Sequence, residues 1–455
     1  MKKIIAFLLA FLTLTMLFGC GGKPSTLNGV PLDRYAIVYS DTDTDYAYRA
    51  AGYIRDQIKL RKGIELPLQE DSQVTAEYEI VVGDTDREIS TILDADTGSN
   101  TFAIQAAGKQ IGLEGDYFFI AAAAYYFVQS YIPASAFDAQ VPTTATVLSP
   151  ITEPAKNCIF LIGDGMGVNH TKLYEEPPAA LPEGYSDGES VFYGYLLGVE
   201  GRSRTNSLDG VTDSAAGGTA LSSGYKTHNG SVGLNSSEQP VKTLTELANE
   251  LGKATAVMST EAKTGATPAS FSAHATSREE KTDILKSQTV IEEAGTLINC
   301  SFDVYEPKLL ERRLDKEIWE TLDQLEKDGD GFFLMYEEAH IDKHSHKNDM
   351  EKTFLALARF NRAIGLFMEH TFYHPDTFLL ITADHETGRL QPDENGKLAF
   401  HHDDHTDADV PVFAYGSGSE FFQGVTAENV QIPKTIAKFW GVEEFGDPST
   451  EPPLY

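Results

Sequence analysis

Residues 331–346 of the chain, GFFLMYEEAHIDKHSH, begin with an apolar run that is typical of a buried β-strand. Directly after this run come three side chains that can bind a metal ion, Glu337, Asp342 and His346. Carboxylates and imidazoles are common ligands of zinc, and carboxylates also bind magnesium. A strand end is a rigid place for such ligands. By itself, the stretch is equally consistent with a charged surface loop.

Two other stretches repeat the same order of residues. Residues 159–165, IFLIGDG, end an apolar run in Asp164. Residues 378–386, FLLITADHE, end another in Asp384 and His385. Because ligands of parallel sheets lie beyond the carboxyl ends of the strands, we expect the three endings to meet there. Together they predict one site that holds more than one metal ion.

From residue 157 onward, strand-like runs alternate with amphipathic segments of helical period. This alternation is typical of an α/β fold with a doubly wound, largely parallel sheet. The predicted strands are NCIFLIGDG, ATAVMST, FFLMYE, FLLITAD and VPVFAYG. The predicted helices include residues 241–253, 284–294 and 350–369. We expect a domain of this kind over residues 156–455.

The preceding part of the chain predicts a smaller α/β domain, over residues 34–148. In order, it contains a strand at YAIVYS, a helix near residues 46–60, a strand at EIVVGD, a hairpin at AIQAAGKQIGLEGD and a helix at DYFFIAAAAYYFVQSYI. This order resembles the small α/β domain that precedes the catalytic barrel in some glycoside hydrolases. None of these segments is a catalytic motif, so we expect this domain to pack rather than to bind sugar.

The first 22 residues, MKKIIAFLLAFLTLTMLFGCGG, combine a basic start, an apolar stretch and small residues around Cys20. This pattern is typical of a signal peptide. Residues 17–20, LFGC, resemble a bacterial lipobox, which implies cleavage before Cys20 and attachment of lipid to its sulfur. We therefore expect a signal peptide over residues 1–19, a tether over 20–33, and a lipid-anchored protein outside the cytoplasm. The alternative is a plain secretory signal with an incidental cysteine.

The composition restricts the partners. The formal net charge is −32, and a surface this acidic argues against nucleic acid as a ligand. It also repels phosphate esters, so a site for such anions must create positive charge locally, as bound divalent metals do. Beyond Cys20 the chain has only Cys158 and Cys300. Cys158 lies in an apolar run, and we expect a buried thiol there and no disulfide.

One serine is a candidate nucleophile. Residues 211–233, VTDSAAGGTALSSGYKTHNGSVG, place Ser214 between Asp213 and a run of small residues. A helix that begins at this point would offer backbone amides to a bound anion. Ser214 could instead serve only as a helix N-cap, a common role for serine.

The motifs GDGMG, TDSAAGGTALSSGYKT, ATPASFSAH, TSR, FFLMYE, IDK, TADHE and HTDADVPV occur in this chain in the order in which alkaline phosphatases carry them. Residues of about 157–440 therefore resemble the alkaline phosphatase family. The resemblance implies a phosphomonoester hydrolase that releases inorganic phosphate through a phosphoserine at Ser214, with two zinc ions and one magnesium ion. It implies small phosphate esters as substrates.

The resemblance also implies the roles of individual residues. One zinc ion would be held by Asp342, His346 and His405. The second would be held by Asp164, Asp384 and His385, with Ser214 as its reacting ligand. The magnesium ion would be held by Asp164, Thr267 and Glu337. Arg278 matches the arginine that grips phosphate, since a guanidinium can bind two oxygens at once; a surface arginine paired with Glu279 is the alternative.

Two residues depart from the family pattern. Gly265 stands where one bacterial branch has Asp beside the magnesium and other branches have His, and Thr387 replaces a His of that branch. Such changes around the ligands put the third metal in doubt. The segment between Cys300 and Gly329 is shorter than in many relatives, which leaves open whether the chain forms a homodimer. The family gives no role to four other histidines, which we expect at the surface: His340, His344, His401 and His402.

Two other functions stay open at this stage. A phosphodiesterase of the same superfamily would use similar metals, although such enzymes more often carry Thr as the nucleophile and lack the segment that leads to Arg278. A non-enzymatic surface lipoprotein that binds glycan through its N-terminal domain is the second alternative, but an intact ligand set argues against it. A sulfatase is disfavoured because TDSAAG lacks the sulfatase motif.

Overall fold

The computed structural model describes residues 25–40, 45–73, 76–94, 101–115, 119–148, 153–174, 177–178, 192–300 and 307–455. Contacts divide the chain into two compact units, Met1–Ser149 and Pro150–Tyr455. Cys20 and the signal and lipobox residues lie outside the described residues. Within the described part of the chain, no helix combines the length and the apolar character that crossing a bilayer requires.

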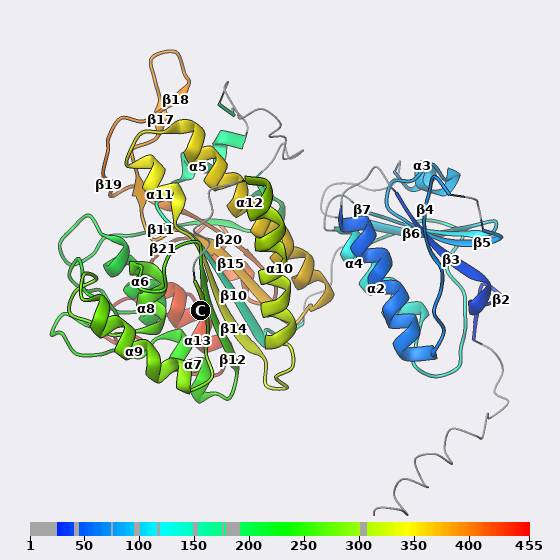
Figure 1. Ribbon diagram of the computed structural model, residues 1–455, viewed down its shortest axis with the longest axis horizontal. Helices are drawn as coiled ribbons and strands as arrows, with labels where there is room; N and C mark the ends of the chain where they lie inside the picture. Colours follow the sequence, from blue (N-terminus) through cyan, green and yellow to red (C-terminus); the bar gives the residue numbers. More distant parts are fainter. Residues whose placement is uncertain are drawn as a thin grey trace, which may run out of the picture. The chain divides into compact units, whose positions relative to one another are not determined.

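The smaller unit is built on a six-stranded sheet. Its strands lie in the order β4 (Leu68–Glu70), β3 (Tyr35–Tyr39), β5 (Tyr78–Val82), β7 (Gln110–Gly115), β6 (Phe102–Ala107) and β9 (Thr146–Leu148). Three helices pack on this sheet, α2 (Asp45–Lys62), α3 (Glu88–Asp94) and α4 (Phe119–Tyr131) (Figure 1). The predicted hairpin is confirmed, since β6 and β7 pair in antiparallel register. A short second sheet joins β1 (Thr26–Leu27) to β2 (Val30–Pro31) and β8 (Asp138–Ala139).

The larger unit contains an eight-stranded sheet. Its order is β13 (Leu297–Cys300), β12 (Ala254–Ser259), β14 (Phe332–Glu338), β10 (Asn157–Gly163), β15 (Thr377–Thr382), β20 (Val410–Tyr415), β11 (Glu200–Arg204) and β21 (Thr426–Glu428). The neighbours from β13 to β15 are parallel, and β20 runs antiparallel to β15 and β11. The predicted α/β class with a largely parallel sheet is confirmed.

Helices cover both faces of this sheet (Figure 1). α10 (Pro307–Leu325) and α12 (Met350–Tyr373) pack together on one face. α7 (Leu244–Glu250) and α8 (Ala266–Ser272) contact the other face, with α6 (Ser214–Ser223) and α13 (Gln431–Phe439) packed on them. The described part of this unit also contains α5 (Val168–Thr171), α9 (Lys281–Glu293) and α11 (His340–Ser345).

The core explains why the central strands have apolar sequences. All residues of β10, β14 and β15 are buried, because both faces of these strands lie under helices. Their side chains form one cluster with residues of α7 and α13, in which Phe160, Phe333 and Leu380 are almost completely buried. Cys158 belongs to this cluster as a free buried thiol, as expected. A well-packed central sheet holds the strand ends in fixed positions.

Candidate active site

Three neighbouring strands end beside one another in residues that can bind metal ions. Asp164 follows β10, Glu337 lies near the end of β14, and Asp384 and His385 follow β15. The register sets Ile162 of β10 beside Glu337 on one side and beside the last residue of β15 on the other. The residues that the sequence placed after apolar runs therefore lie at one edge of the sheet.

The turn after β10 needs glycine at position 165. Gly165 has a φ of +73°, a left-handed conformation that glycine adopts without strain. A Cβ atom at this position would lie 2.8 Å from Cα of Asp342 and 2.9 Å from Oγ1 of Thr387. The absence of a side chain at Gly165 therefore lets the segments from β14 and β15 close tightly around the end of β10.

The first cluster of ligand atoms consists of Asp164, Asp384 and His385, all buried, with ligand atoms within 4.8 Å of one another. Nε2 of His385 lies 3.5 Å from Oδ1 of Asp164 and 3.3 Å from Oδ2 of Asp384. The same nitrogen is 3.2 Å from Oγ of Ser214. The predicted second zinc set and the candidate nucleophile are thus in mutual contact.

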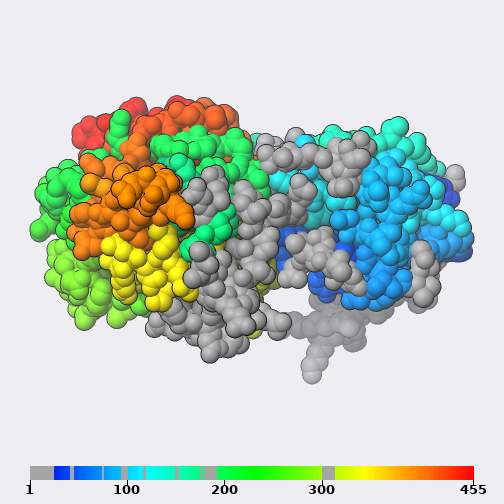
Figure 2. Space-filling view, turned by 90° about the horizontal axis from the view of Figure 1, so that it is seen from above, coloured from blue at the N-terminus to red at the C-terminus, as the bar shows by residue number. Residues whose placement is uncertain are grey.

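The second cluster consists of Asp342, His346 and His405. The two imidazole Nε2 atoms are 3.1 Å apart, and they lie 3.3 Å and 3.5 Å from Oδ1 of Asp342. Asp342 is on α11, and His346 directly follows that helix. His405 comes from the short strand β19 (His405–Thr406), which pairs with β16 (Glu386–Thr387). Figure 2 shows the orange segment near residue 400 against the yellow segment near residue 345.

The two clusters are adjacent. The rings of His385 and His405 stack with centroids 3.6 Å apart. Thr387 joins the clusters, since its Oγ1 donates to Oδ1 of Asp342 at 2.6 Å and lies 3.2 Å from Nδ1 of His385. With the Nδ1 proton of His385 directed to Thr387, the Nε2 lone pair of that ring is left for a ligand.

The third predicted set lies beside the first. Thr267 on α8 and Glu337 on β14 are fully buried. Oγ1 of Thr267 and Oε1 of Glu337 form no hydrogen bond of standard geometry, although the Thr267 hydroxyl is close enough to Glu337 to act against the rise of its pKa; Oε2 of Glu337 accepts a hydrogen bond from Ser259. The charge of Glu337 also acts on Asp164. These closely spaced buried oxygens fit a cation that prefers oxygen ligands.

The space beside Gly265 is filled by another acidic residue. A Cβ atom at Gly265 would overlap the carboxylate of Glu261, four residues earlier. Oε2 of Glu261 accepts a hydrogen bond from Nζ of Lys343 at 2.6 Å. The negative charge of Glu261 acts on both Glu337 and Asp164. A carboxylate is therefore present in this region even though position 265 is glycine.

The pKa values show how much negative charge the clusters concentrate. Burial, then the charges of Asp384 and Asp342, hold the pKa of Asp164 well above its usual range. Burial and the charge of Asp342 raise the pKa of Asp384 to about 7. Burial and the charge of Glu261 raise the pKa of Glu337 to about 8. Crowded buried carboxylates of this kind favour bound cations, which stabilise their ionised form.

The donor sets also fit metal ions by their chemistry. Oδ1 of Asp164 and Oδ2 of Asp384 are buried and have no hydrogen-bond partner. In a folded protein, such unpaired oxygens are rare without a ligand or a water molecule. Each of the first two clusters supplies a mixture of imidazole and carboxylate, which suits zinc. The third supplies only oxygen, which suits magnesium.

The candidate nucleophile lies at the start of a helix. Ser214 is the first residue of α6 and is 4% exposed. Asp213, and not Ser214, is the N-cap, because its side chain accepts from the amide of Ala216. Asp213 also accepts a hydrogen bond from Nη1 of Arg278 at 3.1 Å. The arginine is therefore fixed next to the serine.

The prediction for four other histidines is wrong in part. His401 and His402 are exposed, as expected. His344 is only 7% exposed, and the side chain of His340 is 16% exposed and lies 3.2 Å from Oγ1 of Thr260. α11 packs against α12, and the contact buries this part of the helix. The sequence around His340 and His344 is rich in charged and polar residues, so it gave no sign of this burial.

Several residues at the site were not singled out from the sequence. Asp213 was noted only as the neighbour of Ser214, and Thr387 only as a departure from the family pattern. Glu261 and Lys343 were missed. Lys343 lies within the quoted IDK motif, and Glu261 lies four residues before Gly265, in the turn that precedes α8. The signal that could have found them is the missing side chain at Gly265.

Comparison of this sequence with known proteins finds matches to alkaline phosphatases. A sequence model described as Alkaline phosphatase matches residues 155–303 and 299–393. The chain is 29% identical over 339 residues to Alkaline phosphatase 3 of Bacillus subtilis (strain 168), a match that covers 62% of this chain and 71% of that protein. It is 38% identical over 135 residues to the alkaline phosphatase of Escherichia coli (strain K12), covering 28% of this chain and 27% of the other.

Comparison of structures agrees. The alkaline phosphatase from the Antarctic bacterium TAB5 matches with a TM-score of 0.55 and 25% identity, over 65% of this chain and 100% of that one. A variant of that enzyme is described with Mg bound in its M3 site. The alkaline phosphatase of Thermus thermophilus, at 17% identity and a TM-score of 0.55, shares the fold over 66% of this chain and 94% of its own.

The family model spans more than half of the 455 residues, and it includes most of the residues gathered at the strand ends. The relatives and the solved structures point to the same enzymes. We conclude that this chain belongs to the alkaline phosphatase family and is a phosphatase.

Proposed function

We propose that the protein hydrolyses phosphomonoesters through a phosphoserine at Ser214. The observation that carries this proposal is the position of Ser214 Oγ, 3.2 Å from Nε2 of His385 and at the first residue of α6. A hydroxyl at that place touches a cluster of metal-ligand type and has helical amides beside it. The proposed substrates are small phosphate esters, because the recognised group is the phosphate.

We propose two zinc ions and one magnesium ion as the resident cofactors. Asp342, His346 and His405 would hold one zinc ion. Asp164, Asp384 and His385 would hold the other. Asp164, Thr267 and Glu337 would hold magnesium. When bound, such ions supply Lewis acidity, lower the pKa of a coordinated hydroxyl and neutralise charge on the transferred phosphoryl group.

The residues of the chain then have distinct tasks. Ser214 Oγ attacks phosphorus, an Oγ–phosphorus bond forms as the bond to the leaving oxygen breaks, and in net the serine proton is transferred through solvent to the leaving oxygen. Arg278 holds the nonbridging oxygens, and the carboxylate of Asp213 fixes the guanidinium in place. With this proton, the leaving oxygen departs as an alcohol. Water then cleaves the phosphoserine, which restores Ser214 and releases inorganic phosphate.

We propose that Glu261 supplies the carboxylate that one branch of the family carries as Asp at the position of Gly265, which this chain lacks there. Its side chain lies over Gly265 and is held by Lys343 at 2.6 Å. Its charge acts on Asp164 and Glu337, two of the proposed magnesium ligands. Glu261 is therefore a positioning residue for the third metal ion, and its carboxylate comes from position 261 of the sequence instead of position 265.

The test of the main proposal compares three chromogenic esters of p-nitrophenol: the phosphomonoester, the bis-phosphodiester and the sulfate. We expect the monoester to be hydrolysed fastest in the presence of zinc and magnesium. Ser214→Ala should lower this rate by at least about 10³-fold, whereas Ser237→Ala, at an exposed loop position, should leave it unchanged. Preference for the diester, or full activity of Ser214→Ala, would contradict the proposal.

We further propose that Cys20 carries a lipid that anchors the protein to the outer side of a bacterial membrane. The support is the basic start, the apolar stretch and the LFGC sequence of residues 1–20. Cells that express the chain should incorporate labelled palmitate into it, and Cys20→Ala should abolish the label. An unlabelled chain that partitions into the aqueous phase of a detergent extraction would sink this proposal.

A further inference from the structure

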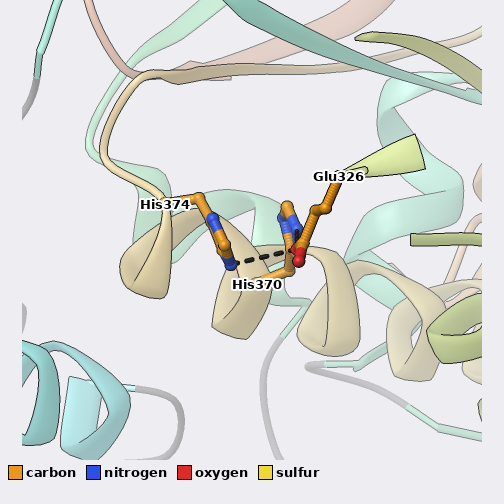
Figure 3. Close-up of side chains that lie close together, drawn as sticks. All are labelled: Glu326, His370 and His374. Atoms are coloured by element: carbon orange, nitrogen blue, oxygen red, sulfur yellow. Dashed lines mark hydrogen bonds and ion pairs between the residues drawn. The ribbon is translucent and has the colours of Figure 1, made fainter. Parts of the chain in front are cut away.

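A second group of metal-ligand side chains lies outside the candidate active site. Glu326 directly follows α10, His370 lies in the last turn of α12, and His374 is the residue at which α12 ends. A spacing of four residues sets the two histidines on the same face of the helix. Figure 3 shows the three side chains converging from the two helices.

The geometry of this group is compact. Oε1 of Glu326 lies 2.5 Å from Nε2 of His370 and 3.0 Å from Nε2 of His374. The two imidazole rings are stacked, with centroids 4.3 Å apart and planes 12° from parallel. Ligand atoms of all three residues lie within 4.8 Å of one another. Small side-chain movements would therefore let one ion contact all three.

The group is separate from the active site. α10 leads into β14 and α12 leads into β15, so Glu326, His370 and His374 lie near the amino ends of these strands. The active-site residues lie at the carboxyl ends. A strand of six or seven residues spans roughly 20 Å, which is too far for the two sites to share an ion.

The residues around His370 bury its ring and leave one ring nitrogen without a partner. Its side chain is 1% exposed, and the rings of Phe332 and Trp319 lie 5.9 Å and 6.4 Å from it. Its Nδ1 atom has no hydrogen-bond partner. A buried polar atom without a partner is rare in a folded protein unless a water molecule or an ion occupies the place beside it.

We propose that Glu326, His370 and His374 form a binding site for a borderline divalent transition metal, with zinc as the expected ion. Two imidazoles and one carboxylate are a common set of zinc ligands, whereas magnesium and calcium prefer oxygen alone. The side chains of Glu326 and His374 are 31% and 38% exposed, so a fourth position is open to water. The ion would tie the end of α10 to the end of α12.

The competing explanation is a hydrogen-bonded cap without metal. A carboxylate that accepts from two imidazoles at a helix carboxyl end would also be stable. The two explanations differ in one measurable property, which is the affinity of the group for a transition metal.

The test uses Trp319 as a local reporter. The chain has two tryptophans, and Trp440→Phe leaves Trp319 as the only one. Chelator-stripped protein of this background is titrated with Co²⁺, a paramagnetic ion that quenches nearby fluorescence. We expect Co²⁺ to quench the fluorescence of Trp319 in a saturable way. The apparent affinity for Co²⁺ should fall at least about tenfold after His374→Asn or Glu326→Gln. Both changes are at partly exposed positions, and retained hydrolysis of the chromogenic monoester reports that each variant is folded.

The matched control is Glu320→Gln, which removes an exposed carboxylate from the same helix, where it pairs with Lys316. This variant should bind Co²⁺ as the parent does. Zinc bound per chain at equilibrium should fall by about one ion in His374→Asn and Glu326→Gln, with hydrolysis of the chromogenic monoester retained. Unchanged Trp319 fluorescence on Co²⁺ addition, or an equal zinc content in parent and variants, would overturn the proposal.

Discussion

Oγ1 of Thr387 donates a hydrogen bond to Oδ1 of Asp342 at a distance of 2.6 Å. The same hydroxyl lies 3.2 Å from Nδ1 of His385. Asp342 belongs to one ligand cluster and His385 to the other, so a single fully buried side chain orients a member of each. Hydrogen bonds that hold metal-ligand side chains in this way strongly affect the affinity for the metal.

Thr387→Val should therefore weaken both clusters. Valine keeps the shape of threonine but removes the hydroxyl, which leaves Asp342 and His385 without this partner. We expect the zinc concentration for half-maximal phosphatase activity to rise by about 10- to 100-fold. Thr387→Ser, which keeps the hydroxyl, is the control and should stay within a few-fold of the parent. An unchanged zinc requirement in Thr387→Val would show that the hydroxyl does not orient the ligands.

Arg278 should determine the affinity for phosphate. Arg278→Ala removes the guanidinium that Asp213 holds beside Ser214. We expect kcat/KM for the monoester to fall by roughly 10²-fold and inhibition by inorganic phosphate to weaken in parallel. Arg204→Ala, at an exposed position paired with Glu428, should change neither quantity. Phosphate inhibition that survives in Arg278→Ala would assign the arginine a structural role only.

Glu261 and Gly265 should depend on each other. Gly265→Asp alone places a side chain where Glu261 already lies, and Glu261→Ala alone removes the carboxylate that Lys343 holds. Both single variants should lose stimulation by magnesium. The double variant Gly265→Asp with Glu261→Ala has one carboxylate in the region, and it should recover activity above either single variant. If the activity losses of the two single variants simply add in the double variant, Glu261 does not replace a carboxylate at position 265.

Metal removal should make stability depend on pH. In the metal-free protein the pKa values of Asp384 and Glu337 are raised, to about 7 and about 8, chiefly by burial. In the unfolded chain such carboxyls titrate near pH 4. Between about pH 4 and 8 these two carboxyls therefore bind more protons in the folded, metal-free protein than in the unfolded chain, so their contribution to stability falls as pH rises.

The measurement is Tm from pH 5 to pH 9, for chelator-stripped and metal-loaded protein. The Tm gap between the two forms should widen as pH rises, because bound cations stabilise the ionised carboxylates. A gap that stays constant over this range would mean that these carboxyls are not what the metals neutralise.

The sequence predicted the parts of the site that depend on strands. Apolar runs ending in Asp164, Glu337 and Asp384 are a local pattern, and buried parallel strands bring such endings to one edge. The sheet order and the antiparallel direction of β20 depend on long-range pairing, which no local pattern in the chain specifies.

Which side chains contact one another, and which are buried, was harder to predict from the sequence. Glu261 matters only because Gly265 leaves room for it, and that relation appears once the backbone is folded. The helix predicted to end at residue 369 continues to Tyr373, and the difference hid the pairing of His370 with His374. Burial of His344 also depends on the packing of α11 against α12.

The most direct test of the account is the identity of the phosphorylated residue during turnover. Protein loaded with zinc and magnesium is mixed with a labelled phosphomonoester, quenched in acid and digested, and the labelled peptide is sequenced. The account predicts a phosphate on Ser214, in the peptide that contains TDSAAG, and no label in Ser214→Ala. Turnover of the monoester by Ser214→Ala at the parental rate, or a label on another residue, would contradict it.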